Sequence, residues 1–321
     1  MEAEACLPDQ LRPWQDFKGK RVNVVQIGLG TFGTFVQNLA GDECDGCIKW
    51  LLEACSERCP ESVSGVAVEP VAEHIDHLRI VARRLPNLEL VQAAIGQDDV
   101  KDGLYFLSSA THKALLGCVP LWQRKALEED LIYVRNMSCV GSKHPAMDRL
   151  NEYFDRAYGL TVPTEHTRIN VWTYDRLSRE LNFCGCEVLL IDAEGHDVQI
   201  LRSMVLHCQY EEQRGRDAWP DVVQFETMGH CDCLEGIGAE ANMIEQLKGC
   251  GYILVYWSYH NSVLIHNKDQ VSRPDAVQRL KTWMRTFHCN GCNGRHAVLP
   301  FITSAGGIYC WRCYSSWRER S

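Results

Sequence analysis

The feature that most constrains this chain is an apolar run that ends abruptly in a cluster of titratable residues. After Val-Leu-Leu-Ile at 188–191 come Asp192, Ala193, Glu194, Gly195, His196 and Asp197, and apolar residues then return at helical spacing. A buried parallel strand passes into a helix in this way at the carboxyl edge of an α/β sheet, where such folds place their chemistry. Acids also cap helix N-termini. Capping does not account for three acids and a histidine around one glycine, so we interpret the segment as functional.

Strands and helices alternate through the rest of the chain. Further strands are expected over residues 22–27, 63–68, 88–95, 168–172, 221–226, 252–257 and 262–266. Helices are expected over residues 34–39, 71–85, 120–130, 146–158, 174–181 and 239–248. Alternation of this kind, closed by a hairpin of the last two strands, predicts an α/β fold with a mostly parallel sheet.

A glycine-rich turn follows the first expected strand. Gly28, Gly30 and Gly33 form a Gly-x-Gly-x-x-Gly pattern between that strand and a helix. Glycines let the backbone approach a ligand closely, and the N-terminus of the helix faces that ligand. The pattern fits a nicotinamide dinucleotide, a flavin or the nucleoside of S-adenosylmethionine, and it also fits a tight turn that binds nothing.

Glu69 ends the second expected strand and helps to choose among these cofactors. A carboxylate in this place can accept hydrogen bonds from both hydroxyls of an adenosine ribose. The separation of Gly33 and Glu69 exceeds the roughly 20 residues expected of a dinucleotide enzyme. An insertion over residues 41–61 would account for the excess, and an exposed acid at a strand end is the alternative reading.

Together these motifs resemble those of the FkbM-type methyltransferase family, a branch of the S-adenosylmethionine-dependent enzymes. The resemblance runs in order over residues 22–257. The segments that carry it are the glycine turn at 28–33, Val-Ala-Val-Glu-Pro at 66–70, Val-Gln-Ala-Ala at 91–94, Met-Ser-Cys-Val-Gly-Ser at 137–142, Thr-Tyr-Asp-Arg-Leu at 173–177, Leu-Ile-Asp-Ala-Glu-Gly-His-Asp at 190–197, Phe-Glu at 225–226 and Gly-Tyr at 251–252.

The chain departs from the family pattern in three places. Gln26 stands where the family more often has an acid before the first glycine, so the contact to the methionine ammonium group must come from elsewhere. Asp197 replaces the usual final glutamate of the motif after the fourth strand. Residues 41–62 look inserted and contain Cys44, Cys47, Cys55 and Cys59, which suit either buried thiols or a second metal site.

The resemblance implies a Rossmann-like class I methyltransferase fold, with a mostly parallel seven-stranded sheet and a terminal β-hairpin. It implies methyl transfer from S-adenosyl-L-methionine to an acceptor, and we expect that acceptor to be a hydroxyl of a small molecule or sugar. The expected cofactor-binding residues are Gly28, Gly30, Gly33, Glu69, Ala94 and Ser142. On the acceptor side we expect Asp192 and Glu194 to shape the pocket, His196 to be a candidate base because imidazole titrates near neutrality, and Glu226 to line the same cavity.

Four cysteines near the C-terminus form the second strong signal. Cys289, Cys292, Cys310 and Cys313 make two Cys-x-x-Cys pairs separated by 17 residues. Two such pairs suit a tetrahedral structural Zn²⁺ site. A small module of this kind builds little core, so the metal would supply its folding free energy. A reduced, cysteine-rich tail without metal is the alternative.

Charge marks the same region as distinct. Residues 273–321 carry eight Arg and Lys against two acids, a net of +6, whereas the whole chain carries −9 and residues 1–272 therefore carry −15. We expect an N-terminal extension over 1–20, a methyltransferase domain over 21–272 and the zinc module over 273–321. The basic, aromatic module suits packing on the body or a protein partner better than a nucleic acid, because the body is acidic.

The sequence also bears on the location of the protein, and it leaves two alternatives for its function. The N-terminal residues have no secretory or organelle signal and no apolar run is long enough to span a bilayer, so we expect a cytoplasmic protein without a membrane partner. The alternatives to a methyltransferase are an NAD-dependent oxidoreductase, which the glycine pattern permits, and a non-catalytic methyltransferase-like protein that binds a partner through its zinc module.

Overall fold

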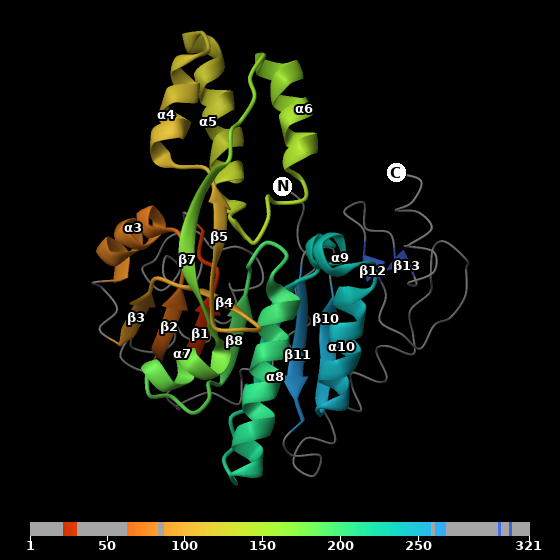
Figure 1. The fold of residues 1–321 in the computed structure, drawn as a ribbon. Coiled ribbons are helices and arrows are strands. Elements are labelled where there is room, and N and C mark those ends of the chain that lie inside the picture. Colours follow the sequence, from red (N-terminus) through yellow and green to blue (C-terminus); the bar gives the residue numbers. More distant parts are fainter. Residues whose placement is uncertain are drawn as a thin grey trace.

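A seven-stranded sheet forms the centre of the molecule (Figure 1). The structure is a computed structural model that describes residues 22–30, 63–82, 87–257, 261–267, 301–302 and 308–309. The strands of the sheet are β1 (Val22–Ile27), β2 (Val63–Val68), β3 (Leu88–Val91), β8 (Val188–Ile191), β9 (Val222–Glu226), β10 (Tyr252–Trp257) and β11 (Asn261–His266). Their order is β10-β11-β9-β8-β1-β2-β3. Strand β11 pairs antiparallel with both of its neighbours, and the other pairs are parallel. The predicted mostly parallel seven-stranded sheet with a terminal hairpin is therefore confirmed.

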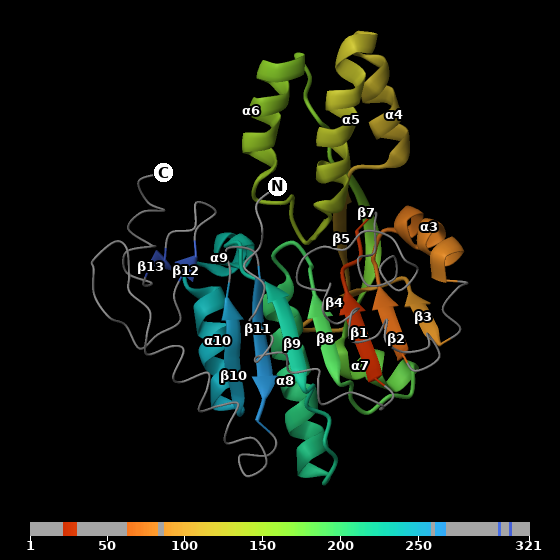
Figure 2. The same cartoon turned by 180° about the vertical axis from the view of Figure 1, so that it is seen from behind.

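The central strands are apolar because both of their faces are covered. Every residue of β8 is buried, and so are Val24, Val25 and Ile27 of β1. Helices α7 (Tyr174–Glu180), α8 (Asp197–Gln213) and α10 (Ala239–Gly249) lie together on one face of the sheet, as the two opposite views show (Figures 1 and 2). Helix α8 sends Val198, Leu201 and Met204 into the main core.

The order of the strands places a topological switch point between β1 and β8. From β1 the chain builds outward through β2 to β3, and it later returns to pair β8 with the other side of β1. In open α/β sheets, ligands bind at the carboxyl ends of the strands beside such a point. Backbone hydrogen bonds from Asp192 N to Ile27 O and from Gly28 N to Val68 O hold the three strand ends together, at 2.9 Å each.

A second sheet of four strands contradicts one prediction. It contains β4 (Ala94–Gly96), β5 (Val100–Phe106), β6 (Cys139–Val140) and β7 (Glu165–Thr173), in the order β4-β7-β5-β6. The single strand predicted over 88–95 is wrong, because the chain leaves the sheet at Gln92 and Ala93 and β4 pairs with β7 instead. Residues 88–95 contain neither Gly nor Pro, so the sequence gives no signal of such a change of partner.

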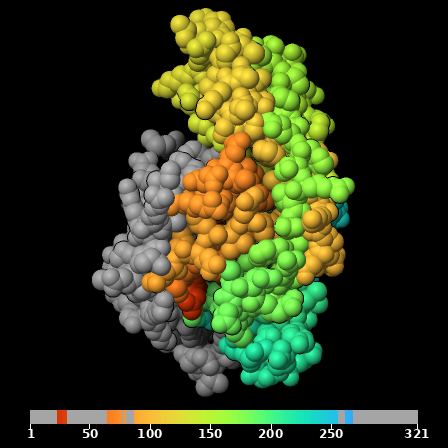
Figure 3. Space-filling model, turned by 60° about the vertical axis from the view of Figure 1, so that its left-hand side comes forward, coloured from red at the N-terminus to blue at the C-terminus, as the bar shows by residue number. Residues whose placement is uncertain are grey.

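Three helices form an arm that stands away from the main sheet. They are α4 (Ser109–Gly117), α5 (Leu121–Asn136) and α6 (Met147–Tyr158). The arm has its own core around Leu127, Leu131 and Phe154, and its yellow residues form the top of the molecule in Figure 3. Helices α5 and α6 begin within a residue of their predicted starts, α5 runs further than predicted, and α4 was not predicted.

The remaining described elements are short. They are α3 (Ala72–Ala82), α9 (His230–Glu235) and the two-residue strands β12 (Phe301–Ile302) and β13 (Ile308–Tyr309), which pair with each other. None of the described helices combines the length and the hydrophobicity needed to cross a bilayer. Apart from β12 and β13, the predicted zinc module over 273–321 lies outside the described residues, as does the predicted extension over 1–20.

Candidate active site

The turn after β1 requires glycine at two positions. Gly28 and Gly30 have φ of +82° and +56°, in the left-handed region that side chains disfavour. A Cβ on Gly28 would stand 1.7 Å from the carbonyl oxygen of Asp192, and one on Gly30 would stand 2.9 Å from Oδ1 of Asn136. Gly28 therefore packs backbone against backbone at the switch point, and Gly30 packs against the side chain of Asn136.

The carboxylate of Glu69 holds this turn in place. Glu69 follows β2 and is 1% exposed. Its Oε2 accepts hydrogen bonds from the N–H groups of Leu29 and Gly30 at 3.0 Å each, and its Oε1 accepts one from Val71 at 2.9 Å. His74 Nδ1 lies 3.2 Å from the same Oε1. The acid expected to bind a ribose thus organises the glycine turn, a structural role that the sequence did not reveal.

A small cavity lies at the carboxyl ends of the central strands. Its lining includes Gly28, Gly30, Glu69 and Ala94 from the expected cofactor side, together with Asp192, Glu194 and His196 from the expected acceptor side. Asn136, Ser138 and Val140, which were not expected, line it as well. The cavity measures about 40 Å³, below the roughly 300 Å³ and more of ordinary ligand pockets. A nucleoside cofactor therefore requires this cavity to widen.

A larger hollow lies elsewhere, between α7 and α8. It measures about 800 Å³, is open to solvent, and is lined by residues such as Asp175, His207 and Arg214. It lies away from the switch point and receives no strand end from β1, β2 or β8. We therefore place the candidate active site at the smaller cavity.

The loop after β8 presents Glu194 in a strained backbone conformation. Glu194 has φ of +50°, a value that non-glycine residues seldom adopt, and Gly195 follows with φ of +102°. A Cβ on Gly195 would stand 3.2 Å from the carbonyl oxygen of His230. Such strain persists only where the surroundings hold it, and it concentrates at functional sites.

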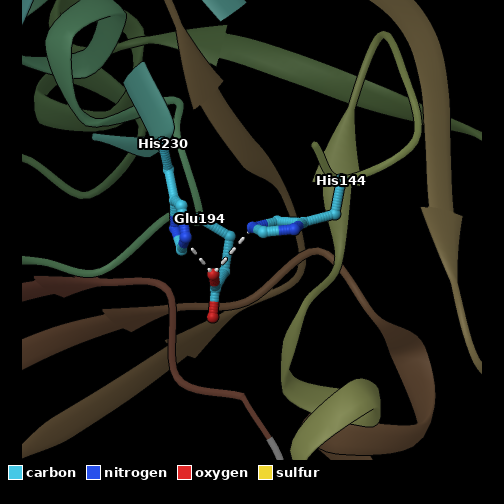
Figure 4. Close-up of side chains that lie close together, drawn as sticks. All are labelled: His144, Glu194 and His230. Atoms are coloured by element: carbon cyan, nitrogen blue, oxygen red, sulfur yellow. Dashed lines mark ion pairs between the residues drawn. The ribbon is translucent and has the colours of Figure 1, made fainter. Parts of the chain in front are cut away.

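Two histidines converge on the Glu194 carboxylate (Figure 4). His144 Nε2 lies 3.1 Å and His230 Nδ1 lies 3.3 Å from Glu194 Oε2. His230 Nδ1 also lies 3.1 Å from Oε2 of Glu226, the acid that ends β9. The two imidazole rings meet edge to face with centroids 4.5 Å apart. We call His144, Glu194, His230 and Glu226 the histidine–glutamate cluster.

Burial and neighbouring charges shift the pKa values of three residues in this cluster. Burial disfavours the Glu194 carboxylate, but the two imidazoles beside it outweigh burial and lower its pKa. Burial likewise opposes the charge on His230, yet its contacts with Glu194 and Glu226 prevail and raise its pKa to about 10. Burial raises the pKa of Glu226 to about 8, and the charges of Glu194 and Asp197 add to that rise. The cluster therefore combines a carboxylate whose pKa is lowered, Glu194, with two groups whose pKa values are raised, His230 and Glu226.

His196 and Asp197 have different roles in the loop after β8. His196 is 9% exposed, lines the cavity and is kept neutral because burial lowers its pKa. Its Nδ1 is buried and has no hydrogen-bond partner among the described residues. Asp197 is fully buried and accepts backbone N–H groups from Gly195 and Glu226 at 3.3 Å, so it ties the loop to β9.

The structure brings together most, but not all, of the expected site residues. Ser142 does not line the cavity, and its hydroxyl donates a hydrogen bond to the carbonyl of Lys143. Glu226 does not line it either and reaches the site through His230. Outside the described residues lie Gly33, the cysteines expected to bind zinc (Cys289, Cys292, Cys310 and Cys313) and the inserted cysteines Cys44, Cys47, Cys55 and Cys59.

Neither histidine of the cluster was among the site residues expected from the sequence. His230 stands four residues after Glu226, and this acid–histidine spacing behind a strand was a signal that could have found it. His144 follows Gly141 and Ser142, in a part of the chain where the sequence predicts only loops between two helices. Nothing local to His144 indicates that it meets Glu194.

Comparisons with known proteins show distant likeness only. No protein-family model matches the sequence and no curated protein matches it, so the resemblance to the FkbM-type family stays a prediction. Two similar solved structures are a fibrillarin in complex with Nop5p (8% identity, TM-score 0.32, covering 78% of this chain and 77% of that chain) and the Aeropyrum pernix fibrillarin with natively bound S-adenosyl-L-methionine (8%, 0.32, 77% and 67%). A third is an O-methyltransferase from Bacillus cereus in complex with SAH (11%, 0.30, 82% and 83%). At these identities and TM-scores the likeness does not extend to function.

Proposed function

We propose that this chain is an S-adenosylmethionine-dependent methyltransferase that methylates a hydroxyl of a small molecule or sugar. One observation carries the proposal: the glycine turn, Glu69 and the loop at 192–196 line a single cavity at the switch point of the sheet. Ligands of open α/β sheets bind at this point. The seven-stranded sheet with its terminal hairpin is also the fold that the FkbM-type resemblance implies.

The cavity has two sides that suit the two substrates. The backbone of Gly28 and Gly30 and the nearby Ala94 form the side for the cofactor, and Glu69 keeps the turn open to it. Glu69 would share its bonded carboxylate with the ribose hydroxyls, since each oxygen can accept more than one hydrogen bond. The cavity widens when the nucleoside enters.

Asp192, Glu194 and His196 form the side for the acceptor. The acceptor oxygen attacks the sulfonium methyl, an O–CH₃ bond forms, and the CH₃–S bond breaks to leave S-adenosylhomocysteine. The hydroxyl proton must leave in this step. Asp192 and Glu194 orient the acceptor. His196 lines the cavity, its Nδ1 has no hydrogen bond to any described residue, and it is the candidate base.

Calorimetric titration of the full chain with S-adenosylmethionine, S-adenosylhomocysteine and NADH tests the proposal. We expect both sulfur compounds to bind and NADH not to bind. Binding of NADH alone would establish the oxidoreductase alternative. Binding of none of the three would favour a non-catalytic protein that acts through a partner.

Substitution of the acceptor side tests the assignment of residues. Asp192→Asn and Glu194→Gln should each lower methyl transfer to a panel of hydroxylated small molecules and sugars by about 100-fold, because a small misplacement of reactants has that effect. Glu180→Gln, a half-exposed acid on α7 outside the cavity, is the matched control. Unchanged turnover in both cavity variants would refute these roles.

We also propose, from the sequence pattern, that Cys289, Cys292, Cys310 and Cys313 hold one structural Zn²⁺ ion. Elemental analysis of the purified chain should find zinc, and Cys289→Ser with Cys310→Ser should remove one equivalent. Retention of all bound zinc in that double variant would contradict the assignment.

A further inference from the structure

We propose that His144, Glu194 and His230 bind a divalent transition-metal ion on the acceptor side of the cavity. This site is distinct from the four cysteines proposed for the C-terminal module. The existence of the site stands on the geometry of the histidine–glutamate cluster alone. Its role in the reaction rests on the proposed methyltransferase function.

The spacing of the ligand atoms fits one ion. His144 Nε2 and His230 Nδ1 lie 3.1 Å and 3.3 Å from Glu194 Oε2, and all three atoms fall within 4.8 Å of one another. Bonds of about 2.0–2.2 Å to nitrogen and oxygen place neighbouring ligand atoms about 3.0–3.5 Å apart around a metal. The three residues come from separate parts of the chain and point toward one another (Figure 4).

The donor set selects the class of metal. Two imidazole nitrogens and one carboxylate suit Zn²⁺, Mn²⁺, Fe²⁺ or Co²⁺, whereas Mg²⁺ and Ca²⁺ prefer oxygen ligands throughout. Three protein ligands also leave coordination positions open, which is typical of a catalytic rather than a structural site. Glu226 Oε2 lies 3.1 Å from His230 Nδ1 but is outside the group of three ligand atoms that lie within 4.8 Å of one another.

The burial of His144 supports the same site. The side chain of His144 is 0% exposed, and its buried Nε2 has no hydrogen bond among the described residues. Its described polar contact is with Glu194, whose Oε2 lies 3.1 Å away. Buried polar atoms are almost always bonded, and a metal ion between the two groups would satisfy this nitrogen.

The second nitrogen of His144 gives the proposal a structural signature. His144 Nδ1 accepts a hydrogen bond from the backbone N–H of Ala146 at 3.1 Å. Ligation through Nε2 puts the ring proton on Nδ1, which then cannot accept that bond. Metal binding should therefore break the Ala146 contact and shift the turn before α6.

The position of the site gives the ion a function. Glu194 lines the cavity beside Asp192 and His196, so an acceptor hydroxyl placed there can reach an open coordination position. A bound divalent ion lowers the pKa of a hydroxyl that it coordinates. The proton then leaves to solvent or a neighbouring base, the oxygen forms a bond to the methyl carbon, and the carbon–sulfur bond breaks with its electron pair on sulfur, so no oxidant or reductant is needed. The acceptor class is thus a hydroxyl compound able to coordinate a metal.

Metal binding by the full chain tests the site directly. The Cys289→Ser and Cys310→Ser variant, made without a polyhistidine tag, removes the C-terminal site from the measurement. After dialysis against chelator, we expect calorimetry to show one Zn²⁺ or Co²⁺ bound per chain, and the Co²⁺ complex to absorb in the visible range. Absence of binding to this chain would overturn the proposal.

Ligand variants in the same background locate the ion. His230→Ala and Glu194→Gln should each weaken binding by more than about 100-fold, since loss even of a residue that only supports a ligand weakens binding about 10–100-fold. His207→Gln is the control, because His207 is buried and lies 3.0 Å from Asp175 in a similar pair outside the cavity. Circular dichroism checks that each variant folds, and full affinity in both cluster variants would refute the site.

The two proposals fail separately. A chain that binds S-adenosylmethionine but no metal keeps the proposed function and loses the metal site. A chain that binds metal at the cluster but no S-adenosylmethionine keeps the site and loses the function.

Discussion

The pKa values of buried side chains in this protein depend on burial and on neighbouring charges rather than on the local sequence pattern. Glu240, at the start of α10, is 8% exposed, and its Oε1 has no hydrogen bond among the described residues. Burial, aided by the charge of Asp232, raises the pKa of Glu240 to about 7. A buried acid with few partners makes the free energy of unfolding depend on pH.

The sign of this dependence follows from the raised pKa. Between pH 4.5 and about 7 the folded state keeps the Glu240 proton that the unfolded state loses, so stability falls as pH rises through this range. The loss is at most about 3 kcal/mol. Glu240→Gln should therefore raise the free energy of unfolding relative to wild type at pH 8 and change it little at pH 4.5, as measured in urea.

Glu245→Gln is the control for that measurement. Glu245 lies on the same helix with a side chain that is 70% exposed, so its substitution should change stability by less than about 0.5 kcal/mol at either pH. If Glu240→Gln also leaves the pH dependence unchanged, Glu240 does not hold a raised pKa.

At the scale of elements, the meeting of β1 and β8 sets the geometry of the site. The turn after β1 approaches the chain that leaves β8 closely, backbone to backbone, at Gly28 and Asp192. The apolar runs and glycines predicted both elements, and they also predicted the carboxyl edge at which the candidate site lies. The division of residues 88–95 between two sheets escaped prediction, because the sequence of a short strand does not show which strand it pairs with.

Gly28→Ala should disrupt this meeting. The new Cβ would stand 1.7 Å from the carbonyl oxygen of Asp192 in a backbone with φ of +82°, so we expect a loss of about 3 kcal/mol or more. Urea unfolding and binding of S-adenosylmethionine measure the effect. Gly117→Ala in α4, where a Cβ meets nothing within 4 Å, should instead be neutral or stabilise by up to about 1 kcal/mol. Equal stability of the two variants would contradict the close approach.

At the scale of the whole molecule, the arm of α4, α5 and α6 has a hydrophobic core of its own and adjoins the site. Its core around Leu127 and Phe154 is separate from the main core beneath the sheet. The segment between α5 and α6 supplies Ser138 and Val140 to the cavity and carries His144 to Glu194. The order of the arm therefore bears on the acceptor side of the site.

Phe154→Ala should loosen the arm without unfolding the sheet. Phe154 is 1% exposed, and its removal should cost about 3–5 kcal/mol of local stability. Hydrogen exchange should then lose protection in α4, α5 and α6 while β1 and β8 keep theirs. Leu121→Ala, at a side chain 78% exposed on α5, is the control. Equal loss of protection in the sheet would show that arm and sheet unfold together.

The sequence by itself determined the α/β class, most strands and helices, and the edge of the sheet where the site lies. These follow from patterns within one element, such as the apolar run of β8 and the acids behind it. Only the tertiary structure decided that Glu69 binds the glycine turn and that His144 and His230 meet Glu194. Such contacts join distant parts of the chain, and their energies depend on burial and distance that no local pattern records.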